Sequence, residues 1–225
     1  MKKTLSAILI CFCIPLLCLS QNEPADSTKN LSEIIVKAYE QNRRLVEVAA
    51  PVSITGQVQL NRFSNMSILP ALNITPGVHM EERSPGSYRL NIRGSSLRSP
   101  FGVRDIKIYL NEIPLTDPSG NTYLNQLSFY NFNSIEIIKG PASSLYGAGI
   151  GGAMLIHTLP VNWYKGISLN YSVGSFDASN INVNVKTGDA DHENSFNYSH
   201  QNSDGYRSQS KMHRDIATWE SLFKV

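Results

Sequence analysis

The chain has 225 residues, of which 41% are hydrophobic and 17% are charged, which excludes both a chain disordered by composition and a bundle of membrane helices. Its formal net charge is +2, but Lys2 and Lys3 lie at the extreme N-terminus, and without them basic and acidic residues balance. The charge therefore gives no reason to expect nucleic acid as a partner. Because Cys11, Cys13 and Cys18 all precede residue 20, the rest of the chain excludes a thiol nucleophile, a cysteine zinc site and a disulfide scaffold.

Residues 1–20 predict a secretory signal peptide. Lys2 and Lys3 form a short basic start, an apolar run follows from Leu5 to Leu19, and Ser20 offers a small residue for cleavage. The apolar run is too short for a comfortable membrane span. We therefore expect an exported protein.

Residues 21–48 predict a flexible arm. The first part, 21–31, is polar and shows no periodicity. Residues 31–38, with the sequence LSEIIVKA, form a short apolar island within it. We expect this island to be a β-prone stretch in an otherwise loose tether.

Residues 49–160 predict a compact α+β domain with a mixed four-stranded sheet and short helices. Alternating apolar residues between turn signals predict the strands, and a proline at the start of 141–146 allows one helical turn there. Four glycines crowd into residues 147–152. The expected strands are 52–55, 88–93, 103–110 and 134–139, and the expected helices are 65–72 and 141–146.

Residues 161–225 change in character and predict antiparallel transmembrane β-strands. Apolar residues such as Ile167, Leu169 and Val173 alternate with asparagine and serine. Ten residues at about 3.3 Å each, tilted by about 45°, span roughly 23 Å, close to the apolar band of about 25 Å in outer-membrane barrels. The alternative is a soluble antiparallel sheet with one wet face.

Several stretches together make the chain resemble the TonB-dependent outer-membrane receptors. The resemblance implies a 22-stranded barrel closed by an N-terminal plug. It divides the chain into a signal peptide (1–20), an arm with a TonB box (21–48), a plug domain (49–160) and the first strands of a truncated, incomplete barrel (161–225). The stretches that carry it are LSEIIVKA (31–38), LNITPGV (72–78), RLNIRGSS (89–96), VRDIKIYLNEIPLTDPSG (103–120) and IEIIKGPASSLYGAGIGGAMLIHT (135–158).

The resemblance also implies roles for individual residues. The expected TonB box, which a partner grips, carries Lys37 where the family more often has threonine, and an ordinary first strand is the alternative. The expected plug cations, Arg93 and Lys139, would face carboxylates on the barrel wall, and the family often has arginine in place of Lys139; solvated strand ends are the alternative. The box is Ile34, Ile35, Val36, Lys37 and Ala38. The plug motif is Gly94, Gly140, Pro141, Tyr146, Gly147, Gly149 and Gly152.

The function implied by the resemblance is energy-coupled uptake across the outer membrane. The expected partners are TonB with its inner-membrane energising complex, outer-membrane lipid, and a metal-chelate ligand. A ferric siderophore is the first expectation for that ligand, ahead of cobalamin, haem and other metal complexes. No cofactor, metal site or nucleic acid is expected, and the work is conformational rather than chemical.

Two other classes of protein, an enzyme and a soluble binding domain, are the alternatives to a receptor. Residues 147–152 match GxGxxG, but a dinucleotide fingerprint directly follows a strand and opens a helix, whereas here a strand-like AMLIHT follows. The five histidines show no metal-ligand spacing, and no nucleophile is paired with a base, so an enzyme is not expected. The remaining alternative is a soluble periplasmic β-domain that binds a partner.

Overall fold

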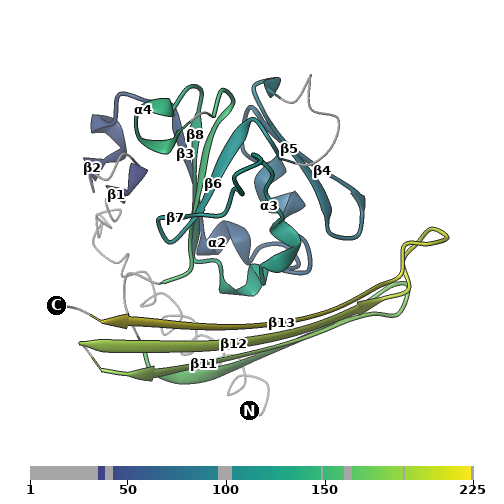
Figure 1. The fold of residues 1–225 in the computed structure, drawn as a ribbon. Coiled ribbons are helices and arrows are strands. Elements are labelled where there is room, and N and C mark those ends of the chain that lie inside the picture. The colour runs from purple at the N-terminus through teal and green to yellow at the C-terminus, as the bar shows by residue number, and fades with distance from the viewer. Residues whose placement is uncertain are drawn as a thin grey trace, which may run out of the picture. The chain divides into compact units, whose positions relative to one another are not determined.

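The computed structural model describes residues 35–38, 43–95, 103–147, 149–159, 164–189 and 191–223 (Figure 1). Within 35–159 these residues form a domain of sheet and short helices, which we call the mixed domain. Residues 164–223 form an antiparallel sheet, which we call the C-terminal sheet. The change from one architecture to the other falls where the sequence pattern changes.

A mixed sheet of five strands is the centre of the described mixed domain. Its order is β3-β8-β9-β6-β7, in which β6 and β9 are parallel and the other neighbours are antiparallel. Three of its strands fall on expected strands (52–55, 103–110 and 134–139), whereas the expected strand 88–93 pairs in a separate hairpin and β9 takes its place in the sheet. The strands are β3 (Val52–Gly56), β6 (Ile106–Leu110), β7 (Ile113–Pro114), β8 (Ser134–Lys139) and β9 (Gly152–His157).

One face of this sheet carries the larger apolar core. Side chains alternate along a strand, so Ile135 and Ile137 of β8 share this face and are fully buried. A hairpin and four short helical segments contribute the opposing residues of the core. These elements are β4 (Val78–Ser84), β5 (Ser87–Ile92), α2 (Gln57–Leu60), α3 (Leu69–Asn73), η5 (Leu124–Gln126) and η6 (Phe129–Asn131).

Two elements on this side differ from the sequence-based expectation. The expected helix over 65–72 begins only at Leu69, with Pro70 in its first turn, where a missing N–H is tolerated. Strand β4 was not predicted; His79 and Glu81 lie on one face of it. Its other face is apolar, and Val78 and Met80 are buried in the core.

The other face of the central sheet is covered by the N-terminal segment. Val36 and Ala38 are fully buried and pack in a second cluster with Ile138, Tyr146 and Leu155. The described residues of the expected arm therefore lie packed on the domain rather than loose, which differs from the expected flexible tether. The elements on this face are β1 (Ile35–Val36), β2 (Arg43–Arg44), η3 (Leu45–Glu47) and α4 (Ser143–Tyr146).

The C-terminal sheet is an antiparallel meander in which each described strand pairs with the next. Its apolar face is exposed to the surroundings: Leu169 is 68% exposed, and Ile167 and Val173 are similarly open. Its polar face is the buried one, with Asn180 and Asn197 fully covered. The strands are β10 (Gly166–Gly174), β11 (Ala178–Gly188), β12 (His192–Ser203) and β13 (Met212–Phe223).

The helices of the described residues are short. None of them is both long and apolar enough to cross a membrane.

The core of the mixed domain gives a direct test of the fold. Ile137→Ala removes a fully buried side chain, and we expect it to lower the free energy of unfolding by about 2–5 kcal/mol through lost burial and a residual cavity. The matched control is Ile113→Ala, because Ile113 is 70% exposed. Urea unfolding followed by circular dichroism measures both. Equal destabilisation by the two changes would contradict the assigned core.

Candidate functional site

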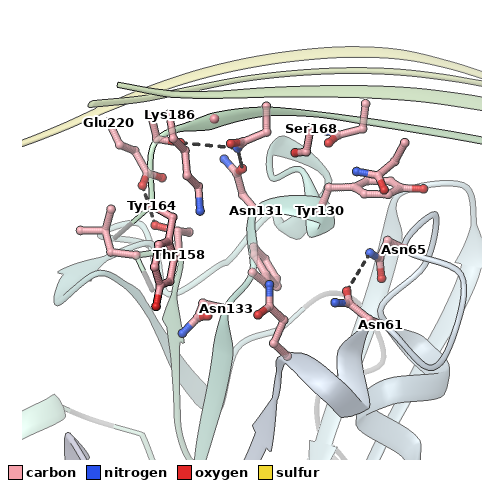
Figure 2. A pocket seen from close by; sticks show the side chains of 18 of the residues that line it. Asn61, Asn65, Tyr130, Asn131, Asn133, Thr158, Tyr164, Ser168, Lys186 and Glu220 are labelled. Atoms are coloured by element: carbon pink, nitrogen blue, oxygen red, sulfur yellow. Dashed lines mark hydrogen bonds between the residues drawn. The ribbon is translucent and has the colours of Figure 1, made fainter. Parts of the chain in front are cut away.

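A cavity of about 570 Å³ lies between the mixed domain and the polar face of the C-terminal sheet (Figure 2). Most of the side chains in its lining are amides and hydroxyls, joined by the charged Lys186 and Glu220. Such a lining offers many hydrogen-bond donors and acceptors with little net charge. The amide and hydroxyl residues among the lining include Asn61, Asn65, Asn131, Asn133, Asn170, Asn182, Asn184, Ser168, Ser195 and Thr158.

Hydrogen bonds from both sides join the mixed domain to the sheet around this cavity. The Thr158 hydroxyl donates to Oε2 of Glu220 at 2.7 Å, and Nδ2 of Asn184 donates to Oδ1 of Asn131 at 3.1 Å (Figure 2). Further along, Nη1 of Arg214 donates to a backbone carbonyl of the mixed domain, that of Asn125, at 3.3 Å. Polar contacts of this kind exchange readily with water, so this contact differs in character from an apolar core.

Asparagines also pair within the polar face of the sheet. Asn182 and Asn197 exchange side-chain hydrogen bonds of 3.2 and 3.3 Å across β11 and β12. Both side chains are buried, and an unpaired amide at this position would lose free energy on burial. This pair of buried amides is therefore satisfied within the sheet.

The two expected plug cations lie together at one end of β8. Nη1 of Arg93 donates to the carbonyl oxygen of Lys139 at 3.2 Å, and Nζ of Lys139 donates to the carbonyl oxygen of Pro76 at 2.6 Å. Neither cation forms an ion pair with a carboxylate in the described part of the chain. Burial, and secondly the charge of Arg93, lowers the pKa of the Lys139 ammonium below its usual value.

The glycine-rich motif forms the loop that leads into β9. Gly152 has φ of +133°, and a Cβ there would lie 2.1 Å from the carbonyl oxygen of Ile138, so a larger residue would clash with β8. A Cβ on Gly149 would come within 2.8 Å of the carbonyl oxygen of Gly152. Since the loop opens a strand and not a helix, it lacks the geometry of a dinucleotide site.

The other members of the expected plug motif surround this loop. Gly94, Gly140 and Gly147 all have positive φ, of 82°, 120° and 70°. Tyr146 is buried and packs edge-to-face on Tyr109, with ring centroids 5.3 Å apart. Pro141 lies just before the short helix α4. The motif thus shapes backbone turns and packing beside β8 and β9.

The described residues of the expected TonB box are held by a buried carboxylate. The backbone N–H groups of Lys37 and Ala38 donate to Oε1 and Oε2 of Glu136, each at 2.9 Å. Glu136 lies on β8, points to the face covered by the N-terminal segment and is almost fully buried. The side chains of Ile35 and Lys37 point outward, and Ile34 lies outside the described residues.

Sequence reasoning missed Glu136 and its neighbour His157. Nε2 of His157 lies 3.5 Å from Oε1 of Glu136, and this buried imidazole nitrogen makes no hydrogen bond among the described residues. The signal available in the sequence was a glutamate next to three isoleucines in IEIIK (135–139), because a buried strand rarely contains an acid. An acid in such a strand needs donors from elsewhere, and here they come from the N-terminal segment.

Comparison with known families decides what this arrangement is. The model of the TonB-dependent receptor plug domain matches residues 44–153, which span nearly all of the mixed domain. Residues 44–153 are therefore a plug domain of the TonB-dependent receptor type. The mixed domain is this plug domain, and the C-terminal sheet consists of barrel-type strands.

A curated relative agrees with this family, but the match covers only part of that protein's length. The vitamin B12 transporter BtuB of Vibrio vulnificus (strain YJ016) is 25% identical over 194 residues, which cover 81% of this chain and 30% of that protein. The chain therefore spans less than a third of this curated relative.

Solved structures show the same fold. The pyoverdine outer membrane receptor FpvA from Pseudomonas aeruginosa PAO1 has a TM-score of 0.62 at 14% identity, covering 78% of this chain and 25% of its own. The ferric-catecholate import receptor Fiu from E. coli K12, in its open form, has a TM-score of 0.61 at 17% identity, covering 80% and 26%.

The cation pair of the plug yields a prediction about protonation. Arg93→Gln removes a positive charge beside Lys139. The protonated form of Lys139 is then less disfavoured, so its pKa should rise. The pKa of Lys139 should return only part of the way to its usual value, because burial is the larger cause of its lowering. Titration of 13C-labelled lysine by NMR, with Lys139→Arg to assign the signal, measures the change. Arg62→Gln is the control; a Lys139 pKa that falls or stays fixed in Arg93→Gln would contradict the assigned contact.

Proposed function

We propose that the protein is an energy-coupled uptake receptor of the outer membrane, exported by its N-terminal leader. The observation that carries this proposal is the orientation of the C-terminal sheet. The apolar side chains of β10 are exposed, whereas Asn180, Asn182 and Asn197 on the opposite face of the sheet are buried. A soluble sheet would bury the apolar face, whereas a barrel strand turns that face to lipid and its polar face to the lumen.

The alternative of a soluble periplasmic β-domain has less support. Ile167, Leu169, Tyr171 and Val173 all lie open on one face of β10 in the described structure. A continuous exposed apolar face of this kind marks a surface meant for lipid or for another protein. The alternation of apolar outward and polar inward residues along β10 and β11 favours lipid.

We propose further that residues 34–38 are the TonB box and that TonB, energised by its inner-membrane complex, grips them. A short extended segment can add as a strand to a partner's sheet edge. In the structure the backbone N–H groups of Lys37 and Ala38 are engaged by Glu136, and Val36 is buried. The docked segment must therefore leave β8 before the partner can pair with it.

Detachment would act directly on the plug. Glu136 and Lys139 belong to the same strand, β8, and Lys139 contacts the backbone of Pro76 and is contacted by Arg93. We propose that Arg93 and Lys139 pair with carboxylates of the barrel wall, as the family resemblance implies. Pulling the segment would then disturb β8 and its contacts to the wall together, opening a path past the plug.

The ligand class is proposed from the family. A ferric siderophore is the first choice, because Fiu is a ferric-catecholate import receptor and FpvA a pyoverdine receptor, and cobalamin is the second, because the relative BtuB is a vitamin B12 transporter. Haem and other metal complexes follow. The amide-rich lining of the cavity suits passage of a hydrated polar solute rather than an apolar one.

The docking of the TonB box is tested by its partner's affinity. Glu136→Gln keeps the size of the side chain but removes the charge and one acceptor, so the segment should be released more often. Because apparent affinity scales with the fraction of competent molecules, binding to the periplasmic domain of TonB should tighten by about tenfold. Calorimetry or surface plasmon resonance on the chain in detergent measures this.

A second variant should weaken the binding to TonB instead of tightening it. Val36→Pro removes a backbone donor from the segment and should abolish binding, since strand addition depends on main-chain hydrogen bonds. Glu112→Gln, a change of the same chemistry at a surface turn, is the control and should leave affinity unchanged. Unaltered binding in Val36→Pro would refute residues 34–38 as the TonB box. Unaltered binding in Glu136→Gln alone would refute the proposal that Glu136 holds the segment on the plug.

A further inference from the structure

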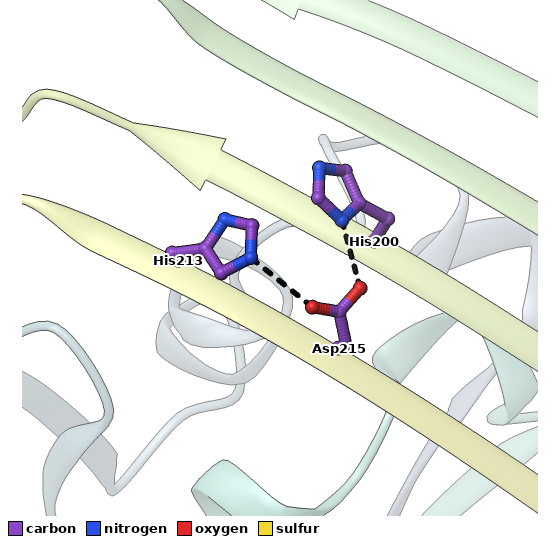
Figure 3. A group of neighbouring side chains, drawn as sticks. All are labelled: His200, His213 and Asp215. Atoms are coloured by element: carbon purple, nitrogen blue, oxygen red, sulfur yellow. Dashed lines mark hydrogen bonds and ion pairs between the residues drawn. The ribbon is translucent and has the colours of Figure 1, made fainter.

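Three side chains with metal-binding atoms converge on neighbouring strands of the C-terminal sheet (Figure 3). His200 on β12 lies directly opposite Asp215 on β13, and His213 lies two residues before Asp215 on the same face. Nδ1 of His200 is 2.8 Å from Oδ1 of Asp215, and Nε2 of His213 is 3.2 Å from Oδ2. One ligand atom from each residue falls within 4.8 Å of the others.

The group lies on the outward face, away from the cavity. Along β12, Asn197, Ser199 and Gln201 are buried on the polar face, while Phe196, Tyr198 and His200 alternate with them on the outer face. The lining of the cavity contains none of the three converging residues. The group therefore lies outside the cavity.

The chemistry of the three side chains selects a class of ion. Imidazole nitrogen suits zinc, copper and nickel, whereas calcium and magnesium prefer sites made of oxygen alone. A zinc ion needs ligand atoms at about 2.0–2.2 Å, so three atoms already within a few ångströms of one another require only small side-chain rotations. Because the three ligands lie at the end of β12 and the start of β13, next to the turn 204–211, they also leave coordination positions for water or another group there.

A neighbouring hydroxyl holds the carboxylate in place. Tyr198 donates to Oδ1 of Asp215 at 2.7 Å. Partners of this kind orient a metal-ligating carboxylate and raise affinity. The rings of His200 and His213 lie edge-to-face with centroids 4.9 Å apart, which limits the freedom of both imidazoles.

We propose that His200, His213 and Asp215 form a binding site for a first-row divalent transition-metal ion of the zinc type, which clamps β12 to β13 near the turn 204–211. The site was not expected, because residues 200, 213 and 215 are separated in sequence and only the pairing of the two strands brings them together. Its occupation adds a cross-strand link on the outer face without touching the plug domain. An ion that binds the folded state alone also stabilises it.

The test uses the full chain in detergent micelles, with Cys11, Cys13 and Cys18 each changed to serine so that leader thiolates cannot bind the probe. Cobalt(II) is the spectroscopic probe, since coordination by imidazole and carboxylate gives visible d–d absorption, and zinc(II) competes for the site. The expected result is one bound ion per chain, with a thermal midpoint that rises with zinc concentration.

Variants distinguish a built site from scattered histidines. His213→Gln and Asp215→Asn should each weaken binding by at least about tenfold, and Tyr198→Phe should weaken it by about the same factor through loss of orientation. The matched control is His79→Gln, because His79 lies on the surface 3.3 Å from Glu81 and so offers one imidazole and one carboxylate without a third ligand.

Each outcome decides the proposal. Loss of binding in His213→Gln and Asp215→Asn, with circular dichroism unchanged and His79→Gln like the parent, supports the site. No binding by the parent chain, or binding that survives both changes, overturns it. A zinc-dependent rise in thermal midpoint that persists in His213→Gln also overturns it, since the stabilising ion would then be bound elsewhere.

Discussion

The burial of amides rather than apolar side chains on one face of the C-terminal sheet is the constraint on which the structure depends. Asn182 and Asn197 satisfy each other across two strands, and other polar side chains of this face bond to the plug domain. An apolar contact here would join plug and strands into one permanent core. A hydrogen-bonded, partly hollow contact keeps the plug in place while leaving it separable, and it leaves the apolar face for the surroundings.

The N-terminal segment is likewise held by polar contacts that other hydrogen-bond partners can replace. The central sheet of the plug has apolar residues on both faces, and residues 35–38 and 43–48 supply part of the cover for one of them. That cover is fastened through two backbone N–H groups on Glu136, a carboxylate too deeply buried to remain without donors. Because Glu136 and Lys139 share β8, the fastening of the segment and the position of the plug cations are linked through one strand.

Local pattern was enough to predict the parts of the fold in which periodicity and burial agree. Strand 134–139 has the predicted bounds, and the alternation at 167–173, 180–186 and 195–199 indicated β10, β11 and β12 and the apolar face of each. Family resemblance supplied the plug and its glycine motif, in which Gly152 meets a geometric need through its close approach to Ile138. Helix α3 is shorter than predicted because a proline in its first turn sets its start.

What sequence could not supply depends on contacts between distant residues. Glu136 finds its donors about a hundred positions away, and the group around Asp215 exists only because β12 and β13 pair in one register. Residues 35–38 lie in what the sequence alone predicts to be a short apolar island in a loose tether, because Val36 and Ala38 become a core only against β8 and β9. Polar residues with long-range partners are thus the ones that a local pattern misassigns.

The central claim concerns which face of the C-terminal sheet meets lipid, and site-directed spin labelling tests it most directly. With the three leader cysteines replaced, single cysteines at Leu169 and Asn182 would carry nitroxide labels in the chain reconstituted into bilayers. The label at Leu169 should collide freely with oxygen and little with a water-soluble nickel chelate, as lipid-exposed sites do. The label at Asn182 should be shielded from both. Strong collision of the Leu169 label with the chelate, or burial of that label with lipid contact at Asn182, would contradict the account.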